Sequence, residues 1–344
     1  MPVTLIAGTT LDAVTFRSIR IDTSFLILGV YLVIVGTAIV FMNIDEKHIL
    51  SQKGRVFPYL RLMTPLVFQF LIGNLLSASL VFYWFGGAIS ASWPILLVIT
   101  LFMISNEVFR RAFRRPVVQM SLYFFILFSI ASLFFPYVFN SIDAKIFIAG
   151  GVVSLLVFIV FTNILSRFLD QIKRAQLPIA ISVLSIFVAM NALYFLNVIP
   201  PIPLSLREAG VYHSVERISG GYRLREEPES WINRILPGQV LHIQQGERVY
   251  VYSSIFAPAD LNTTIVHHWE FYDETKHAWI DKDYLSFAMS GGRNAGYRGY
   301  SLKSSVAPGK WRVSVETARG QVLGRVWFDV ESVATRSSLQ EIIK

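Results

Sequence analysis

The sequence predicts six membrane-spanning α-helices over residues 24–199, followed by an all-β antiparallel sandwich of the immunoglobulin-like type. Three observations carry this prediction. Charged residues make up only 16% of the 344 residues, whereas a soluble chain carries about a quarter. Long apolar stretches fill the first three fifths of the chain. After a run of prolines at residues 200–203, the hydrophobic period changes to two, which is typical of strands.

The N-terminal segment, residues 1–23, precedes the first long apolar stretch. It is too short and too polar to form a seventh span. The pattern of Leu5, Ile6, Phe16 and Ile19 instead predicts a segment that lies at the membrane surface.

Six apolar stretches match or approach the roughly 20 residues that a helix needs to cross a bilayer core about 30 Å thick. Prolines stand at or near the first turn of three stretches, where the missing N–H leaves no hydrogen bond unmade. Trp and Tyr lie at several ends, as in the aromatic belts of membrane helices. The predicted spans are Ser24–Met42, Thr64–Tyr83, Trp93–Asn106, Val117–Phe135, Ile146–Leu165 and Pro178–Ile199.

Basic residues are distributed unevenly among the loops that join these spans. The first, third and fifth loops carry eleven Lys or Arg, whereas the second and fourth carry one. Because cytoplasmic loops are rich in Lys and Arg, we expect these three loops in the cytoplasm. Residues 1–23 and everything after Ile199 are then expected outside it. Arg17 and Arg20 favour the opposite placement of the N-terminus, but they are two charges against eleven.

The chain is predicted to leave the last span through residues 200–210, a proline-rich linker that cannot be helical and is stiff. Residues 211–332 are predicted to form the periplasmic β-sandwich, because short alternating segments are separated by Gly, Pro, Asn or Asp turns. Residues 333–344 are predicted as a frayed or short helical tail. The expected strands are 211–218, 222–225, 240–244, 248–256, 263–272, 278–288, 296–303, 310–316 and 321–330.

The net charge of +8 lies almost entirely in the membrane half. Residues 1–200 hold fourteen Lys or Arg against seven Asp or Glu, and residues 201–344 hold seventeen against sixteen. A nucleic-acid-binding domain would carry its own basic patch, so no nucleic-acid partner is predicted. The lipid bilayer is one expected partner, and a protein or an envelope glycan is the other. The lack of cysteine excludes disulfides and thiolate metal sites, and no cofactor is predicted.

Several segments are similar to those of one family. They are residues 65–77 (PLVFQFLIGNLLS), 106–111 (NEVFRR), 199–204 (IPPIPL), 210–213 (GVYH), 255–258 (IFAP), His268-Trp269, 291–300 (GGRNAGYRGY) with Lys303, and 308–315 (PGKWRVSV). On these segments the chain resembles bacterial polytopic membrane proteins that end in an all-β domain of unknown function, number 2914 in that series. The resemblance implies a multi-pass topology and a periplasmic domain, and it implies no activity, substrate or catalytic residue.

The glycine-rich stretch 290–299 contains Arg293, Tyr297 and Arg298, and Lys303 follows it. It is not a phosphate-binding loop, because no Gly-Lys-Ser/Thr follows and the next element is a strand. One interpretation is a hairpin whose glycines take positive φ and whose arginines are solvated or paired. The other is a ligand- or partner-binding site in which these cations contact an anionic lipid headgroup, envelope polymer or protein patch.

An outward patch of Tyr250, Tyr252 and Trp327 is a second candidate binding site, because these residues alternate with apolar ones along their strands. Such rings stack on sugars in sandwich-type carbohydrate binders. The other interpretation is that the membrane helices or a partner protein cover them.

Alternation on the strand 263–272 places His267 and Trp269 on its apolar face. Trp269 is therefore predicted as the core tryptophan of the sandwich, and His267 as a hydrogen-bonded core residue. A metal site that combines His267 or His268 with other histidines of the domain has no supporting ligand spacing, so no metal site is predicted.

No nucleophile elbow, His-Glu-x-x-His pair or phosphate-binding motif is present, so an enzyme is not predicted. The leading hypothesis is a non-enzymatic inner-membrane protein whose periplasmic sandwich binds a partner protein or an envelope glycan. The alternative is a small-solute transporter, or an accessory subunit of a membrane transport or assembly complex. Its path would be lined by the four amides of the predicted spans, since no acid or base sits mid-span. These amides are Gln69, Asn74, Asn163 and Asn191.

Overall fold

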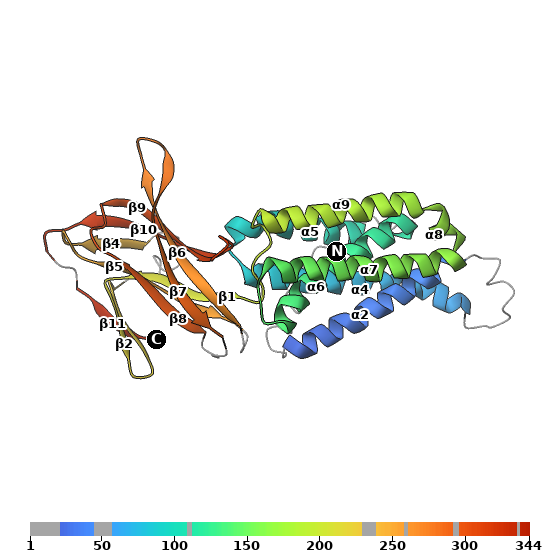
Figure 1. Cartoon of the computed structure of the whole chain (residues 1–344), viewed down its shortest axis with the longest axis horizontal. Helices are drawn as coiled ribbons and strands as arrows, with labels where there is room; N and C mark the ends of the chain where they lie inside the picture. The colour runs from blue at the N-terminus through green and yellow to red at the C-terminus, as the bar shows by residue number, and fades with distance from the viewer. Residues whose placement is uncertain are drawn as a thin grey trace. The chain divides into compact units, whose positions relative to one another are not determined.

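The computed structural model describes residues 21–44, 57–108, 112–228, 239–257, 261–291, 296–335 and 338–344. The chain divides into two compact units. The first comprises Met1–Trp84 and Ser92–Ile199, and the second comprises Phe85–Ala91 and Pro200–Lys344. Figure 1 shows that the described part of the first unit is helical and that the second consists mainly of strands.

Six helices of the described chain are long and apolar enough to cross a membrane, by length and composition. This confirms the predicted number of apolar helices. The short helices η1 (Ala112–Arg114) and α8 (Asp170–Arg174) lie between them. The long ones are α2 (Ile21–Asn43), α4 (Phe57–Gly86), α5 (Ile89–Val108), α6 (Pro116–Val138), α7 (Ala144–Phe168) and α9 (Gln176–Phe195).

The last helix ends earlier than predicted, at Phe195 instead of Ile199. Asn197 has a φ of 58°, and asparagine accepts this left-handed conformation after a helix more readily than most residues. The amide of Leu196 still donates to the carbonyl of Ala192, at 2.9 Å. The helix therefore closes with a C-terminal turn before it reaches the prolines.

Helix α6 is the most buried of the six and packs against α2, α7 and α9. Gly150 and Gly151 of α7 allow the close approach of α6. A Cβ at Gly151 would lie 2.6 Å from Cζ of the buried Phe128, and a Cβ at Gly150 would lie 3.3 Å from the carbonyl oxygen of Ala131. Small residues let the backbones of membrane helices approach in this way.

The second unit contains three sheets. Their strand orders are β1-β5-β8, β4-β10-β9-β6-β7 and β11-β3-β2. Among the described strands, β10 and β4 pair in parallel and the other pairs are antiparallel. The strands are β1 (Ser205–Tyr212), β2 (Ser214–Ile218), β3 (Gly221–Glu226), β4 (Gln239–Ile243), β5 (Val249–Phe256), β6 (Asn262–Asp273), β7 (Ala278–Ser290), β8 (Tyr297–Lys303), β9 (Gly309–Thr317), β10 (Val322–Ser332) and β11 (Gln340–Ile343).

One hydrophobic core joins the β1-β5-β8 sheet and the five-stranded sheet, which we call the two larger sheets. It contains Val211 and Val251 from the β1-β5-β8 sheet, and Trp269, Trp311 and Phe328 from the five-stranded sheet. The ring of Trp269 is fully buried and lies edge-on to both other rings, with centroids 6.4 and 6.1 Å away. Trp269 is thus the core tryptophan, as alternation along its strand predicted.

Three boundaries of the β unit differ from the predicted ones. Strand β1 begins at Ser205, inside the predicted linker 200–210. The predicted strand 211–218 is divided between β1 and β2. The predicted tail 333–344 contains β11, which pairs with β3. Four residues are too few for a periodic pattern, so only the partner strand reveals β11.

Candidate functional site

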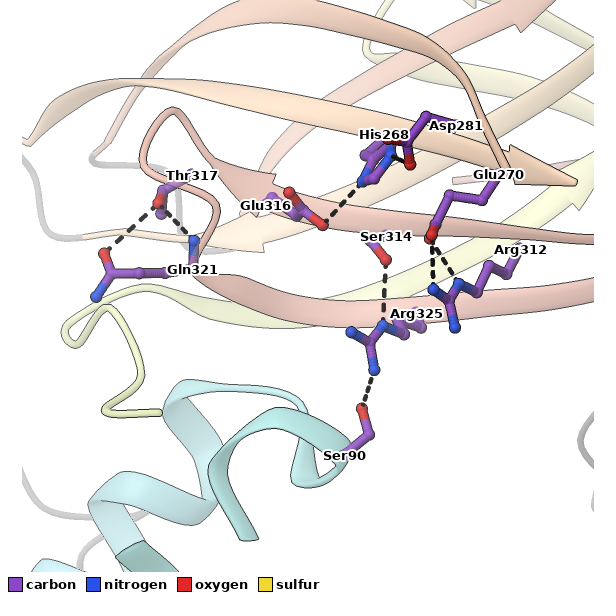
Figure 2. A network of polar contacts seen from close by, with 10 residues as sticks. All are labelled: Ser90, His268, Glu270, Asp281, Arg312, Ser314, Glu316, Thr317, Gln321 and Arg325. Carbon is purple, nitrogen blue, oxygen red and sulfur yellow. Dashed lines mark hydrogen bonds and ion pairs between the residues drawn. The ribbon is translucent and has the colours of Figure 1, made fainter. Parts of the chain in front are cut away.

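Strand β6 carries a buried face and a polar face, because its side chains alternate between the two sides of the sheet. Ile265, His267 and Trp269 are buried. His268 and Glu270 take part in the polar network drawn in Figure 2. We call the side of the five-stranded sheet that carries His268 the polar face.

His267 lies in the interior and connects the two larger sheets. Its Nε2 is 2.8 Å from Oγ of Ser253 on β5, and its Nδ1 is 2.8 Å from Oγ of Ser301 on β8. Burial lowers the pKa of His267 to about 3, because the charged imidazolium is poorly solvated there. The prediction of a hydrogen-bonded core histidine is confirmed.

One row of side chains crosses four strands of the polar face. Trp327, Arg312, Glu270 and Asp281 are successive neighbours on β10, β9, β6 and β7. Arg312 donates from Nε and Nη2 to the two carboxylate oxygens of Glu270, both at 2.6 Å, which is the bidentate geometry of a strong ion pair. Its guanidinium also lies 4.5 Å from the ring centroid of Trp279.

The neighbouring row contains Arg325, Ser314, His268 and Tyr284. His268 stacks on Tyr284 with ring centroids 4.1 Å apart and 14° between the planes. Arg325 donates from Nε to Oγ of Ser314, at 3.2 Å. It also donates from Nη1 to Oγ of Ser90, at 2.8 Å; Ser90 belongs to the 85–91 segment of the same unit.

His268 has a carboxylate on each side. Its Nε2 is 2.8 Å from Oδ1 of Asp281, and its Nδ1 is 3.4 Å from Oε1 of Glu316. Figure 2 shows the imidazole between the two acids, with Glu270 facing Arg312 beside them. Burial raises the pKa of Glu316, although the neighbouring His268 acts in the opposite direction.

Two aromatic rings of the polar face are open to solvent. Tyr284 is 60% exposed and Trp327 is 40% exposed. Arg312 on β9 and Glu270 on β6 stand on the two strands between β10, which carries Trp327, and β7, which carries Tyr284. Exposed rings of this kind offer apolar contact area, while the carboxylates and guanidinium groups offer hydrogen bonds.

The predicted cationic site is not assembled in the described chain. Arg293 lies outside the described residues. Arg298 and Lys303 are five positions apart on β8, whose pairing with β5 is regular, so they point to opposite faces of that strand. Lys303 forms an ion pair with Asp283, and Tyr297 stacks on Phe287.

The structure does not bring the three rings of the predicted aromatic patch together on one exposed surface. Tyr252 is 1% exposed and packs with Tyr212, Val215 and Leu224, and Tyr250 packs against the same cluster. The small sheet that contains β2 and β3 supplies Val215 and Leu224 and covers this side of β5. Alternation along one strand cannot reveal that a third sheet covers its outer side. Trp327 lies apart from both tyrosines, in the five-stranded sheet.

A second polar cluster was not predicted from the sequence. Glu227 accepts hydrogen bonds from the backbone N–H of His242, at 2.8 Å, and contacts Nδ1 of His242 at 2.7 Å and Nε2 of His213 at 2.9 Å. Burial acts to raise the pKa of Glu227, but these hydrogen bonds outweigh it and the pKa lies below its ordinary value. The hydrogen bond to Glu227 raises the pKa of His242.

Three of the four predicted amides, Gln69, Asn74 and Asn191, donate hydrogen bonds to backbone carbonyls of the helices. Gln69 and Asn106 bond to each other's backbone carbonyls, at 3.4 and 2.9 Å. Asn74 and Asn191 donate to carbonyls of their own helices, each at 2.8 Å. Amides in membrane helices commonly satisfy their hydrogen bonds in this way. The transport alternative stays a prediction.

Residues 262–330, which contain most of the polar face, match the model of DUF2914, a protein family of unknown function. The resemblance to that domain is thereby confirmed for this part of the chain. No curated protein matches the sequence.

Two of the solved structures with some similarity to this chain are a bacterial glycosidase and a DNA glycosylase. A β-glucosidase from Listeria innocua in complex with isofagomine is 13% identical, with a TM-score of 0.21, over 38% of this chain and 16% of its own. This chain therefore spans about a sixth of that enzyme. A Pseudomonas fluorescens alkylpurine DNA glycosylase bound to DNA is 11% identical, with a TM-score of 0.24, over 88% and 96% of the two chains. TM-scores this low support neither a shared fold nor a shared activity.

Proposed function

We propose that this chain is a non-enzymatic protein of the bacterial inner membrane that binds a ligand through its C-terminal β unit. The six apolar helices span the membrane. The β unit is an immunoglobulin-like sandwich on the periplasmic side, an orientation supported by the eleven basic residues in the first, third and fifth loops.

The observation that carries the proposed binding site is the composition of the polar face. Two exposed rings are part of this face: Trp327 ends the ion-paired row on β10, and Tyr284 lies in the neighbouring row on β7. A rigid face with aromatic and charged groups needs little reordering on binding, which favours affinity.

An envelope glycan fits this face better than a protein partner. The centre of a protein interface is depleted of charged residues, whereas the polar face carries the carboxylates of Glu270, Asp281 and Glu316 and the guanidinium groups of Arg312 and Arg325. A sugar offers hydroxyls for such groups and an apolar ring face for Tyr and Trp. A protein partner is the second ligand class, because Trp, Tyr and Arg also dominate protein hot spots.

Binding of the detergent-solubilised full chain to isolated peptidoglycan and to an array of bacterial polysaccharides tests the proposal. We expect Trp327→Ala and Tyr284→Ala each to weaken binding about tenfold, corresponding to about 1.4 kcal/mol per ring. Tyr300→Ala is the matched control, since Tyr300 is exposed on β8 in the other large sheet. The glycan proposal fails if the wild-type chain binds none of these glycans, or if the three variants bind equally.

A further inference from the structure

We propose that His268, Asp281 and Glu270 form a binding site for a divalent transition-metal ion of the zinc class. One potential ligand atom of each residue lies within 4.8 Å of those of the other two. Zinc bonds to imidazole nitrogen and carboxylate oxygen are about 2.0–2.2 Å long, so ligand atoms in a tetrahedral site stand about 3.4 Å apart. Small side-chain shifts close the remaining difference.

A shift in strand pairing brings the two acids together. Trp269 pairs with Asp283, but the next residue, Glu270, pairs with Asp281, so Lys282 is an extra residue on β7. Bulges of this kind re-aim side chains and are found beside functional sites. Here the bulge directs Asp281 to the polar face, where it reaches Nε2 of His268.

Glu316 is a hydrogen-bond partner for the ring nitrogen of His268 that would not ligate the metal. A histidine that ligates a metal through one nitrogen usually donates its other N–H to a carboxylate, which sets the tautomer and the ring orientation. Oε1 of Glu316 lies 3.4 Å from Nδ1 of His268. With the proton on Nδ1, the lone pair of Nε2 faces Asp281, and stacking on Tyr284 holds the ring in that plane.

The charged groups around His268 sum to a negative excess that a cation would offset. With neutral His268, the carboxylates of Glu270, Asp281 and Glu316 exceed the guanidinium groups of Arg312 and Arg325 by one negative charge. Both oxygens of Glu270 accept from Arg312, yet each carboxylate oxygen has a further lone pair for a metal. A proton on His268 would neutralise the same excess, so a protonated histidine without metal is the competing outcome.

The site is open on the side of the edge strand. The side chain of Asp281 is 62% exposed, whereas those of His268 and Glu270 are 13% and 7% exposed. Three protein ligands with one open side leave a coordination position for water or a ligand atom. The metal site shares Glu270 and Asp281 with the proposed glycan-binding face, but its test involves no glycan, so each proposal can fail without the other.

Calorimetric titration of the tag-free, chelator-treated full chain in detergent with Zn²⁺ tests the proposal. We expect one ion per chain. His268→Ala and Asp281→Asn should each abolish binding, and Glu316→Gln should weaken it about 10- to 100-fold, as outer-sphere partners do. His277→Asn, a substitution in the β6–β7 turn that preserves a residue tolerant of its φ of 50°, should leave the affinity unchanged.

The absence of stoichiometric binding by the wild-type chain would refute the metal site and leave the protonated histidine. Equal affinity in wild type and Asp281→Asn would also refute it, and this result is decisive because that substitution changes an exposed side chain. Far-ultraviolet circular dichroism separates loss of binding from loss of the fold. If His268→Ala is unfolded, Asp281→Asn and Glu316→Gln still decide the question.

Discussion

His267 and His268 are adjacent in sequence but have opposite environments, because successive residues of a strand face opposite sides of the sheet. His267 bonds to two serine hydroxyls in the interior. His268 stands between two carboxylates on the polar face. The first therefore contributes to the packing of the two sheets, and the second contributes to the chemistry of the surface.

Substitution of His267 tests its connecting role. We expect His267→Phe to lower the free energy of unfolding of the β unit by about 1–3 kcal/mol, because the buried hydroxyl of Ser253 loses its partner. The hydroxyl of Ser301 still accepts from Nε1 of Trp269, at 3.0 Å. Denaturant unfolding of the detergent-solubilised chain, followed by tryptophan fluorescence, measures the change.

The double variant His267→Phe/Ser253→Ala provides the control. Removal of both partners of a hydrogen bond is far less destabilising than removal of one, so the second substitution should recover part of the loss. Additive losses would contradict the hydrogen-bond account.

The cluster around Glu227 predicts a pH dependence of stability. Its lowered pKa contributes stability that is present above about pH 4.5 and is lost as the pH falls. The raised pKa of His242 contributes stability that is present below about pH 6.5 and is lost as the pH rises through the folded value. His213 contacts Glu227 and Glu331 contacts His242, and Glu247 contacts His213 in turn.

We therefore expect Glu227→Gln to destabilise the β unit most between about pH 4.5 and 6.5, by about 1.5–3 kcal/mol, the range for a hydrogen bond to a charged group. Unfolding midpoints measured from pH 4 to pH 9 for both proteins give the difference. A difference that does not vary with pH would show that the cluster is not charged as described.

At the scale of single elements, the long periodic segments were predictable and the short or covered ones were not. Strands β6 and β9 have apolar and polar residues in clear alternation, and the apolar helices are recognisable by their length and composition. Strand β11 has four residues and exists through its pairing with β3. Tyr252 was predicted to be exposed, because the β11-β3-β2 sheet that covers it forms through tertiary contacts that alternation along β5 does not reveal.

The candidate site was only partly predictable for the same reason. Alternation placed His268 and Glu270 on one face of β6, but their partners depend on the register of β7 and β9. The bulge that brings Asp281 opposite Glu270 has no sequence signature. Arg298 and Lys303 are close in sequence, yet the strand separates them onto opposite faces.

The contact between α6 and α7 makes a prediction at the element scale. Gly151→Val should destabilise the helical unit, because its Cβ would overlap the ring of the buried Phe128, and overpacking costs about 1–3 kcal/mol. The thermal midpoint of the detergent-solubilised chain is the measurement. Gly29→Val is the control, since nothing lies within 4 Å of a Cβ at Gly29; equal shifts in both variants would contradict the close contact.

At the scale of the whole molecule, the two units differ in secondary structure and in charge. The apolar helices carry the excess of basic residues in three of their loops, and the β unit is close to neutral. The described polar face lies entirely in the second unit. The proposed function therefore requires that the β unit and the first, third and fifth loops lie on opposite sides of the membrane.

Cysteine labelling measures this arrangement directly, because the chain contains no cysteine. Glu274→Cys introduces a thiol in an exposed turn of the β unit, and Lys173→Cys introduces one at an exposed position of α8, in the fifth loop. A membrane-impermeant maleimide applied to spheroplasts should label Glu274→Cys before lysis and Lys173→Cys only after it. Labelling of Lys173→Cys in intact spheroplasts, with Glu274→Cys protected until lysis, would contradict the proposed orientation and with it the binding of an envelope ligand.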